Sequence, residues 1–323
     1  MTKNRTNFLC LAKVKMCRGR NVMIPIKDYV SIIYKDFNDY VEKNNNLCML
    51  KTLTYEAGQK PDYSDIHIQQ LYLLRYAYSY AFEYKSMYAD LFAREQFKDS
   101  ILVSSIGCGS MIDYWGLVEA LEEINNRNCQ VKYKGIDTIE WNYPIKKREK
   151  DTVDFNKINA STVFKKANKL ISNVYIFPKS ISEFSTNQFE DICEGFSEKE
   201  IEKDKVHILI SLRSDERSMD RDMDRSEKLI LAMKQNGFVT NDQARTYIHF
   251  KEEEKGIKGL DYKFDYPDEA IEFLKSLSGR CNSYINNFKN CSNDCEKYLN
   301  RWPVMKARNI RYQVLSFNRK DSL

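Results

Sequence analysis

Residues 101–110, with the sequence ILVSSIGCGS, decide the fold of this chain. The first six are mostly apolar and are typical of a short buried strand. Two glycines, Gly107 and Gly109, follow in a tight turn, and the next segment, IDYWGLVEALEEINNRN, predicts a helix. A loop without side chains lets backbone amides approach a ligand closely, and the N-terminus of the helix favours an anionic group. We therefore expect a strand, a glycine loop and a helix, with a ligand at the loop.

Strand signals and helical segments alternate along the rest of the chain. The runs that predict further strands are QVKYKGIDTIEW (130–141), NVYIFPKSI (173–181), VHILISLRS (206–214), GFVTND (237–242), RTYIHFKEE (245–253) and RYQVLSFNR (311–319). The charged run KKREKDTVDF (146–155) is expected to form an exposed linker or helix, and residues 225–236 a helix closed by Gly237. The alternation predicts an α/β fold that is Rossmann-like, with a mostly parallel seven-stranded sheet flanked by helices.

The first 98 residues are expected to form a helical N-terminal extension. A helix over 28–44 has apolar residues three or four apart, and a longer helix begins near Ser64 or Asp65 and ends before Asp99. In the longer helix, tyrosines repeat every four residues, at positions 72, 76, 80, 84 and 88. Their rings form a ridge that either packs against the sheet or provides a wall for a base or a substrate. The chain is thus expected to divide into a helical region, 1–98, and a Rossmann-like domain, 99–323, whose C-terminal part contains cysteines.

Two short motifs resemble those of class I methyltransferases, which use S-adenosylmethionine (SAM). The run VSSIGCGS (103–110) resembles their first motif, in which a strand enters a G-x-G loop that opens a helix. The run GID (135–137) ends the next strand, where the family usually has an acidic residue that accepts hydrogen bonds from ribose hydroxyls. The sequence departs from the family pattern at Ser105, where an acidic residue is common, and at Met111, where a glycine is common.

The resemblance implies a set of site residues and a cofactor, SAM. Those implied to bind the cofactor are Gly107, Gly109 and Ser110 at the methionine part, Asp137 at the ribose, and Ser180, after the third predicted strand, at the adenine. Those implied to orient or deprotonate the methyl acceptor follow the fourth strand and are Arg213, Asp215 and Glu216. The run 214–225 also mixes charges closely, so a solvated loop or helix start is the other interpretation of this segment.

The sequence therefore favours a SAM-dependent methyltransferase that acts on a nitrogen or oxygen acceptor. The alternative is a catalytically degenerate Rossmann-like module that binds a nucleotide, a nucleic acid or a protein partner, and Ser105 and Met111 are the reasons for keeping it. The net charge of +5, from 51 basic and 46 acidic residues, is too small to indicate a nucleic-acid protein by itself.

Composition and cysteine usage suggest an ordinary cytoplasmic protein. Hydrophobic residues make up 42% and charged residues 30%, and there is no long apolar run, so we expect no membrane span and no secretory signal. The nine cysteines are scattered and are expected to be reduced thiols. Cys281, Cys291 and Cys295 lie close together in sequence, but the fourth ligand of a metal site is not evident, so ordinary thiols are favoured over a metal cluster.

Overall fold

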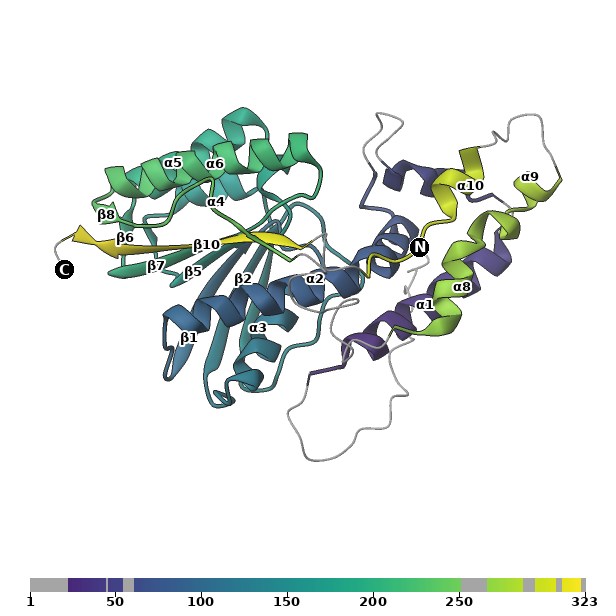
Figure 1. The fold of residues 1–323 in the computed structure, drawn as a ribbon, viewed down its shortest axis with the longest axis horizontal. Coiled ribbons are helices and arrows are strands. Elements are labelled where there is room, and N and C mark those ends of the chain that lie inside the picture. The colour runs from purple at the N-terminus through teal and green to yellow at the C-terminus, as the bar shows by residue number, and fades with distance from the viewer. Residues whose placement is uncertain are drawn as a thin grey trace, which may run out of the picture.

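The computed structural model describes residues 23–44, 46–54, 61–250, 266–286, 294–305 and 310–320. The largest element of the structure is a twisted sheet that has helices on both faces (Figure 1). Its strands are β1 (Ser100–Ile106), β2 (Gln130–Asp137), β3 (Thr152–Lys157), β5 (Val174–Phe177), β7 (Lys205–Ser211), β8 (Phe238–Val239), β9 (Ile248–His249) and β10 (Arg311–Arg319). A separate parallel pair consists of β4 (Lys169–Leu170) and β6 (Glu200–Ile201).

The strand order across the sheet is β3-β2-β1-β5-β7-β10-β8, and β9 pairs with β10 as an eighth strand. The first five strands on this path are parallel, and β10 runs antiparallel to β7, β8 and β9. The predicted Rossmann-like, mostly parallel sheet flanked by helices is confirmed. The predicted count of seven matches the main path, and β9 adds one strand to it because both two-residue strands pair with the long β10.

The interpretation of residues 146–155 as linker or helix is wrong at its end, because β3 begins at Thr152. Only Val153 and Phe155 of this strand pack against the core, while its other side chains are largely polar, as an edge strand allows. Because β3 was missed, each later strand of the central sheet stands one place further along in chain order than the sequence indicated. β5, which the sequence presented as the third strand, is the fourth strand of the central sheet in chain order and lies beside β1.

Two groups of helices cover the two faces of the sheet. On one face, α1 (Ile26–Lys43), α2 (Ile66–Arg94) and α3 (Ile112–Glu123) share one buried apolar cluster with the strands. On the other face, α4 (Ala160–Lys166), α5 (Thr186–Glu198) and α6 (Glu216–Gln235) form a second cluster. Figure 1 shows α2 and α3 on one side of the sheet and α4, α5 and α6 on the other.

Side-chain caps fix where two of these helices begin. The carboxylate of Asp65 accepts from the amides of His67 and Ile68, which confirms the predicted start of α2. Asp215 caps α6 in the same way, by accepting from the amide of Ser218 at 2.9 Å. Most of the charged run 214–225 is therefore the first half of α6, so the predicted helix over 225–236 begins nine residues earlier than expected.

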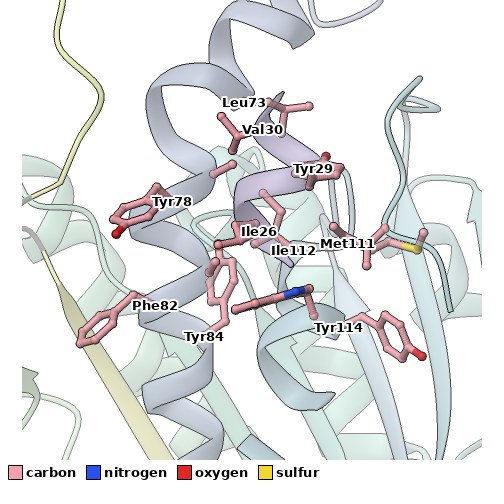
Figure 2. Packing of buried hydrophobic residues seen from close by; sticks show 14 of the residues in the cluster. Ile26, Tyr29, Val30, Leu73, Tyr78, Phe82, Tyr84, Met111, Ile112 and Tyr114 are labelled. Carbon is pink, nitrogen blue, oxygen red and sulfur yellow. The ribbon is translucent and has the colours of Figure 1, made fainter. Parts of the chain in front are cut away.

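The helix α2 lies very close to α3. A Cβ atom placed on Gly116 of α3 would come within 2.7 Å of the backbone nitrogen of Lys85 and of Cβ of Tyr84, so only glycine permits this approach. Figure 2 shows how Ile26 of α1, Tyr84 of α2 and Ile112 of α3 point into the shared core. This packing places the tyrosine-rich helix next to the loop that opens α3.

The last helices of the chain pack with the first ones. These segments are α8 (Asp268–Lys275), η4 (Leu277–Arg280), α9 (Asn282–Ile285) and α10 (Asp294–Leu299), and they lie beside α1 and η1 (Cys48–Thr54) in Figure 1. Phe273 meets Tyr34 of α1 edge to face at 5.4 Å between ring centroids. Arg75 of α2 donates to the carbonyls of Tyr298 and Leu299, both at 2.9 Å. The division of the chain at residues 98 and 99 stays a prediction.

Among the described residues, no helix combines the length and the apolar composition that a membrane crossing needs. Cys281 and Cys295 are buried free thiols, and Cys291 lies outside the described residues. In the part of the chain that the structure describes, no three metal-binding side chains come together. The expectation that these cysteines are ordinary thiols and the cytoplasmic location both stay predictions.

Candidate functional site

The crevice between β1 and β5 marks the point where the strand order reverses. After β1 the chain turns to β2 on one side, and after β3 it crosses to β5 on the other side. In open parallel sheets, ligands bind in this crevice, outside the carboxyl ends of the strands. A pocket of about 140 Å³ lies there. It is lined by Tyr63, Tyr72, Tyr80, Tyr84, Gly107, Cys108, Gly109, Ser110, Ile112, Asp137, Thr138, Ile139, Trp141, Pro178, Lys179, Ser180 and Glu183.

The loop after β1 has a backbone that requires glycine. Gly107 and Gly109 have φ angles of 75° and 53°, in the left-handed region that side chains disfavour. A Cβ atom on Gly107 would also lie 2.5 Å from Cβ of Ser180, which is a severe clash. The amides of Gly107 and Cys108 both donate to the carbonyl of Ile136, at 2.7 and 3.2 Å, and these bonds tie the loop to the end of β2.

Met111 keeps the backbone conformation that a glycine would adopt. Its φ of 63° is left-handed although it carries a side chain, which costs about 1–2 kcal/mol. The side chain is buried in the core beside α3, and this burial offsets the strain. Met111 therefore continues the left-handed backbone of Gly107 and Gly109 although it is not a glycine.

A buried carboxyl group lies beneath the loop even though position 105 is a serine. Asp113, in the first turn of α3, is fully buried, and the hydroxyl of Tyr133 donates to its two oxygens at 2.9 and 3.1 Å. Burial raises the pKa of Asp113 to about 7, against the opposing effect of the Ser105 and Tyr133 hydroxyls. Asp113 does not line the pocket, so its carboxyl group is a buried feature of α3 behind the loop.

Asp137 ends β2 and lines the pocket, as its predicted role requires. Its Oδ2 accepts from the amide of Gly109 at 2.9 Å, and its Oδ1 accepts from the amide of Ile139 at 3.0 Å. Burial raises the pKa of this carboxyl group, and the amides oppose the shift. Each oxygen retains a second lone pair for a ligand hydroxyl.

Ser180 lines the pocket, and its expected contact with adenine stays a prediction. It follows β5, which is the fourth strand of the central sheet in chain order and not the third as expected, and which lies beside β1. The Ser180 hydroxyl donates to the carbonyl of Ile106 and packs against Gly107. Ser110 is also buried, and its hydroxyl interacts with that of Tyr29 on α1. Both serines therefore help to hold the loop in place.

The three residues expected at the acceptor lie near the pocket but do not line it. Arg213 donates through Nη2 to Oε1 of Glu183 at 2.6 Å, and Glu183 lines the pocket. Asp215 is engaged as the cap of α6, and Glu216 is an exposed residue in the first turn of that helix. Of the three, Arg213 has the most direct connection to the pocket.

Lys179 and Glu83, which the sequence patterns did not single out as site residues, meet at the edge of the pocket. The side chain of Glu83 on α2 is only 1% exposed, and its Oε1 lies 2.9 Å from Nζ of Lys179. Glu83 Oε1 also accepts from the hydroxyl of Ser211, and Lys179 donates to the carbonyl of Leu212. An acidic residue inside an apolar helix face, in the run YAFEYK, was the signal that could have identified this pair.

The tyrosine ridge of α2 has different surroundings along its length, and its predicted role as a wall for a base or a substrate stays a prediction. Tyr84 and Tyr88 are buried in the core, in agreement with packing. Tyr72 and Tyr80 are partly exposed and line the pocket, which Tyr84 also reaches. The ridge winds around the helix, so its two ends face different surroundings.

Three comparisons with known proteins found similarity to solved structures alone. No protein-family model matches the chain, and no curated protein matches it in sequence. Among solved structures, the plantazolicin methyltransferase BpumL in complex with S-adenosylhomocysteine (SAH) is 14% identical over 89% of this chain and 99% of that chain, with a TM-score of 0.38. The YcgJ protein from Bacillus subtilis is 9% identical over 73% and 98%, with a TM-score of 0.36.

A SAM-dependent methyltransferase from Archaeoglobus fulgidus is 13% identical over 73% of this chain and 94% of that chain, with a TM-score of 0.34. These likenesses concern the fold alone. The chain resembles class I methyltransferases in fold, and the strand order and the glycine loop described above are where that resemblance lies.

Proposed function

We propose that this chain is a SAM-dependent methyltransferase that transfers a methyl group to a nitrogen or oxygen acceptor. The observation that carries the proposal is that the glycine loop and Asp137 line one pocket at the switch point of the sheet. The loop supplies backbone surface and the carboxylate supplies hydrogen-bond acceptors, which suits a nucleoside attached to an amino acid.

The residues present fit SAM. The absent side chain at Gly107 leaves a backbone surface in the pocket, and Asp137 has lone pairs for the two ribose hydroxyls. When bound, SAM supplies a methyl group activated by its positive sulfonium. Gly107, Gly109 and Ser110 would hold the methionine part and Asp137 the ribose.

The contribution of the chain to the reaction is alignment. A bound acceptor reacts fast when its atom is held in line with the methyl group at contact distance, and this proximity supplies most of the rate. Arg213, through its ion pair with Glu183, is the candidate that orients the acceptor. Asp215 and Glu216 stay predictions for that role.

The rival function is a catalytically degenerate Rossmann-like module that binds a nucleotide, a nucleic acid or a protein partner. The observation that favours it is that position 105 lacks a carboxylate and that the Asp113 carboxyl group accepts from Tyr133. The two functions differ in whether the chain transfers a methyl group.

Isothermal titration with SAM and SAH tests the proposal. We expect both to bind, and we expect Asp137→Ala to weaken binding roughly tenfold or more, because a charge-assisted hydrogen bond is lost. The matched control is Asp154→Ala, which removes an exposed carboxylate from the neighbouring strand β3. Absence of binding at high micromolar concentration would overturn the proposal. Binding without any transfer of labelled methyl to cell extract would support the rival function.

A further inference from the structure

Aromatic side chains form a continuous surface in the pocket, which we call the aromatic wall. It consists of Tyr63, Tyr72, Tyr80, Tyr84 and Trp141. The Trp141 ring lies 5.6 Å from that of Tyr63 and 5.4 Å from that of Tyr72, measured between ring centroids. Tyr80 continues the series at 6.1 Å from Tyr72 and 6.0 Å from Tyr84. The faces of such rings carry negative potential and attract cations.

The positive side chains beside the pocket are both neutralised. Lys179, whose Nζ lies 5.9 Å from the centroid of the Tyr80 ring, forms an ion pair with the buried Glu83. Arg213 forms an ion pair with Glu183. The remaining carboxylate that lines the pocket, Asp137, is bound by backbone amides, which carry no net charge. Of the charged groups named here, the Asp137 carboxyl group is therefore the one that no basic side chain neutralises.

We propose that the aromatic wall recognises the positive sulfonium of SAM, so that the pocket holds SAM more tightly than its uncharged product SAH. The inference rests on the proposed function and goes beyond it, because it assigns the discrimination between substrate and product to residues of α2.

The covalent connections of SAM would bring the sulfonium into the pocket that the wall lines, where Trp141 already comes within 3.6 Å of a Cβ atom built on Gly109. Its sulfur atom joins the methionine chain to the ribose, and the pocket offers the glycine loop to the first and Asp137 to the second. The sulfur must therefore lie between those two contacts, in a pocket whose remaining lining includes Tyr72 and Tyr80. In the reaction, the bond from sulfur to the methyl carbon breaks and its electron pair stays on sulfur, while the acceptor atom forms the new bond. The sulfur thereby loses its charge and its attraction to the rings.

The buried pair of Glu83 and Lys179 has a role in this arrangement. A bare ammonium near the sulfonium would repel it, and the carboxylate of Glu83 cancels that repulsion. Burial raises the pKa of Glu83, and Lys179 and the Ser211 hydroxyl oppose the shift. The pair keeps a lysine close to the pocket at little electrostatic penalty to a bound cation.

Isothermal titration of three ligands tests the inference. SAM carries the sulfonium, SAH has a neutral sulfur, and sinefungin carries an ammonium at the corresponding place. We expect SAM and sinefungin to bind roughly tenfold more tightly than SAH, as a desolvated cation–π contact predicts. Tyr80→Leu should reduce this ratio about threefold or more by weakening SAM and sinefungin and leaving SAH unchanged, whereas Tyr80→Phe should keep the ratio.

The controls separate this inference from a general loss of structure. Tyr247→Leu removes a tyrosine that packs on the other face of the sheet, and it should leave all three affinities unchanged. Glu83→Gln should weaken SAM more than SAH because Lys179 is then unpaired. If Tyr80→Leu weakens SAM and SAH equally, or if SAM and SAH bind equally to the unmodified chain, the inference is wrong and the proposed function stands. If none of the three ligands binds, both fail.

Discussion

The backbone amide of Gly109 donates to Oδ2 of Asp137 at 2.9 Å, which joins the loop after β1 to the end of β2. The two elements that the sequence singled out are thus in direct contact before any ligand binds. Only the ionised carboxylate offers acceptors on both oxygens, to Gly109 and to Ile139. The hydrogen bond therefore fixes the position of the glycine loop relative to Asp137, the two parts of the proposed cofactor site.

Gly107→Ala should be far more damaging than an ordinary glycine substitution. It combines a left-handed backbone with a Cβ atom 2.5 Å from Cβ of Ser180, and we expect a loss of about 3 kcal/mol in the free energy of unfolding. Gly237→Ala is the matched control, since its φ of 81° is also left-handed but no atom lies within 4 Å of the added Cβ. That control should lose only about 1 kcal/mol. Equal losses in urea unfolding would show that the contact with Ser180 does not matter.

The buried pair of Glu83 and Lys179 should behave as a coupled unit. Glu83→Leu leaves an ammonium without its partner and Lys179→Met leaves a buried carboxylate, so each alone should destabilise the fold by about 3–5 kcal/mol. The double variant removes both charges and should be considerably more stable than the sum of the two losses implies. A double-mutant cycle measured by urea unfolding decides this, and additive losses would contradict the pairing.

Asp113 should make stability depend on pH between about 4 and 7. Its pKa in the folded chain is raised to about 7, so the folded state binds its proton more tightly than the unfolded state does. The free energy of unfolding should therefore fall as pH rises through this window, with a contribution from Asp113 of about 2–4 kcal/mol. Asp113→Asn cannot ionise and should show a smaller decline between pH 4.5 and pH 7.5. An identical decline in both proteins would mean that Asp113 is ionised throughout.

Met111→Gly should separate the stability of the loop from its ability to bind. Glycine relieves the left-handed strain of about 1–2 kcal/mol but removes a buried side chain worth about 2–3 kcal/mol. We expect a net destabilisation of about 1 kcal/mol and an unchanged affinity for SAH by titration. A large change in SAH affinity would show that the methionine side chain shapes the site directly.

Local sequence signals predicted the centre of this fold well. The strand of residues 101–107, its glycine loop and the cap at Asp65 all depend on neighbouring residues, and the structure has them where they were expected. The edge strand β3 was missed because only Val153 and Phe155 reach the core and a charged run precedes them. Sequence patterns report burial, and a strand with one partner and few buried residues gives little signal.

The candidate site was predictable on its cofactor side and not on its other side. Gly107, Gly109 and Asp137 follow strands directly, so the strand order alone brings them together. The pairing of Glu83 with Lys179 joins residues that are far apart in sequence, and it depends on how α2 packs on the sheet. Such a contact follows from tertiary packing, which no local pattern records.

The helix α2 has one face fixed by packing and another that meets the pocket. Tyr84 packs closely against Gly116 of α3, whereas Tyr72 and Tyr80 are partly exposed. Substitutions at these two outer positions change the pocket without disturbing the buried face. Substitutions on one side of α2 can therefore alter the ligand preference while the other side preserves the fold. We expect related proteins with different ligands to differ in sequence at the pocket-facing positions of α2.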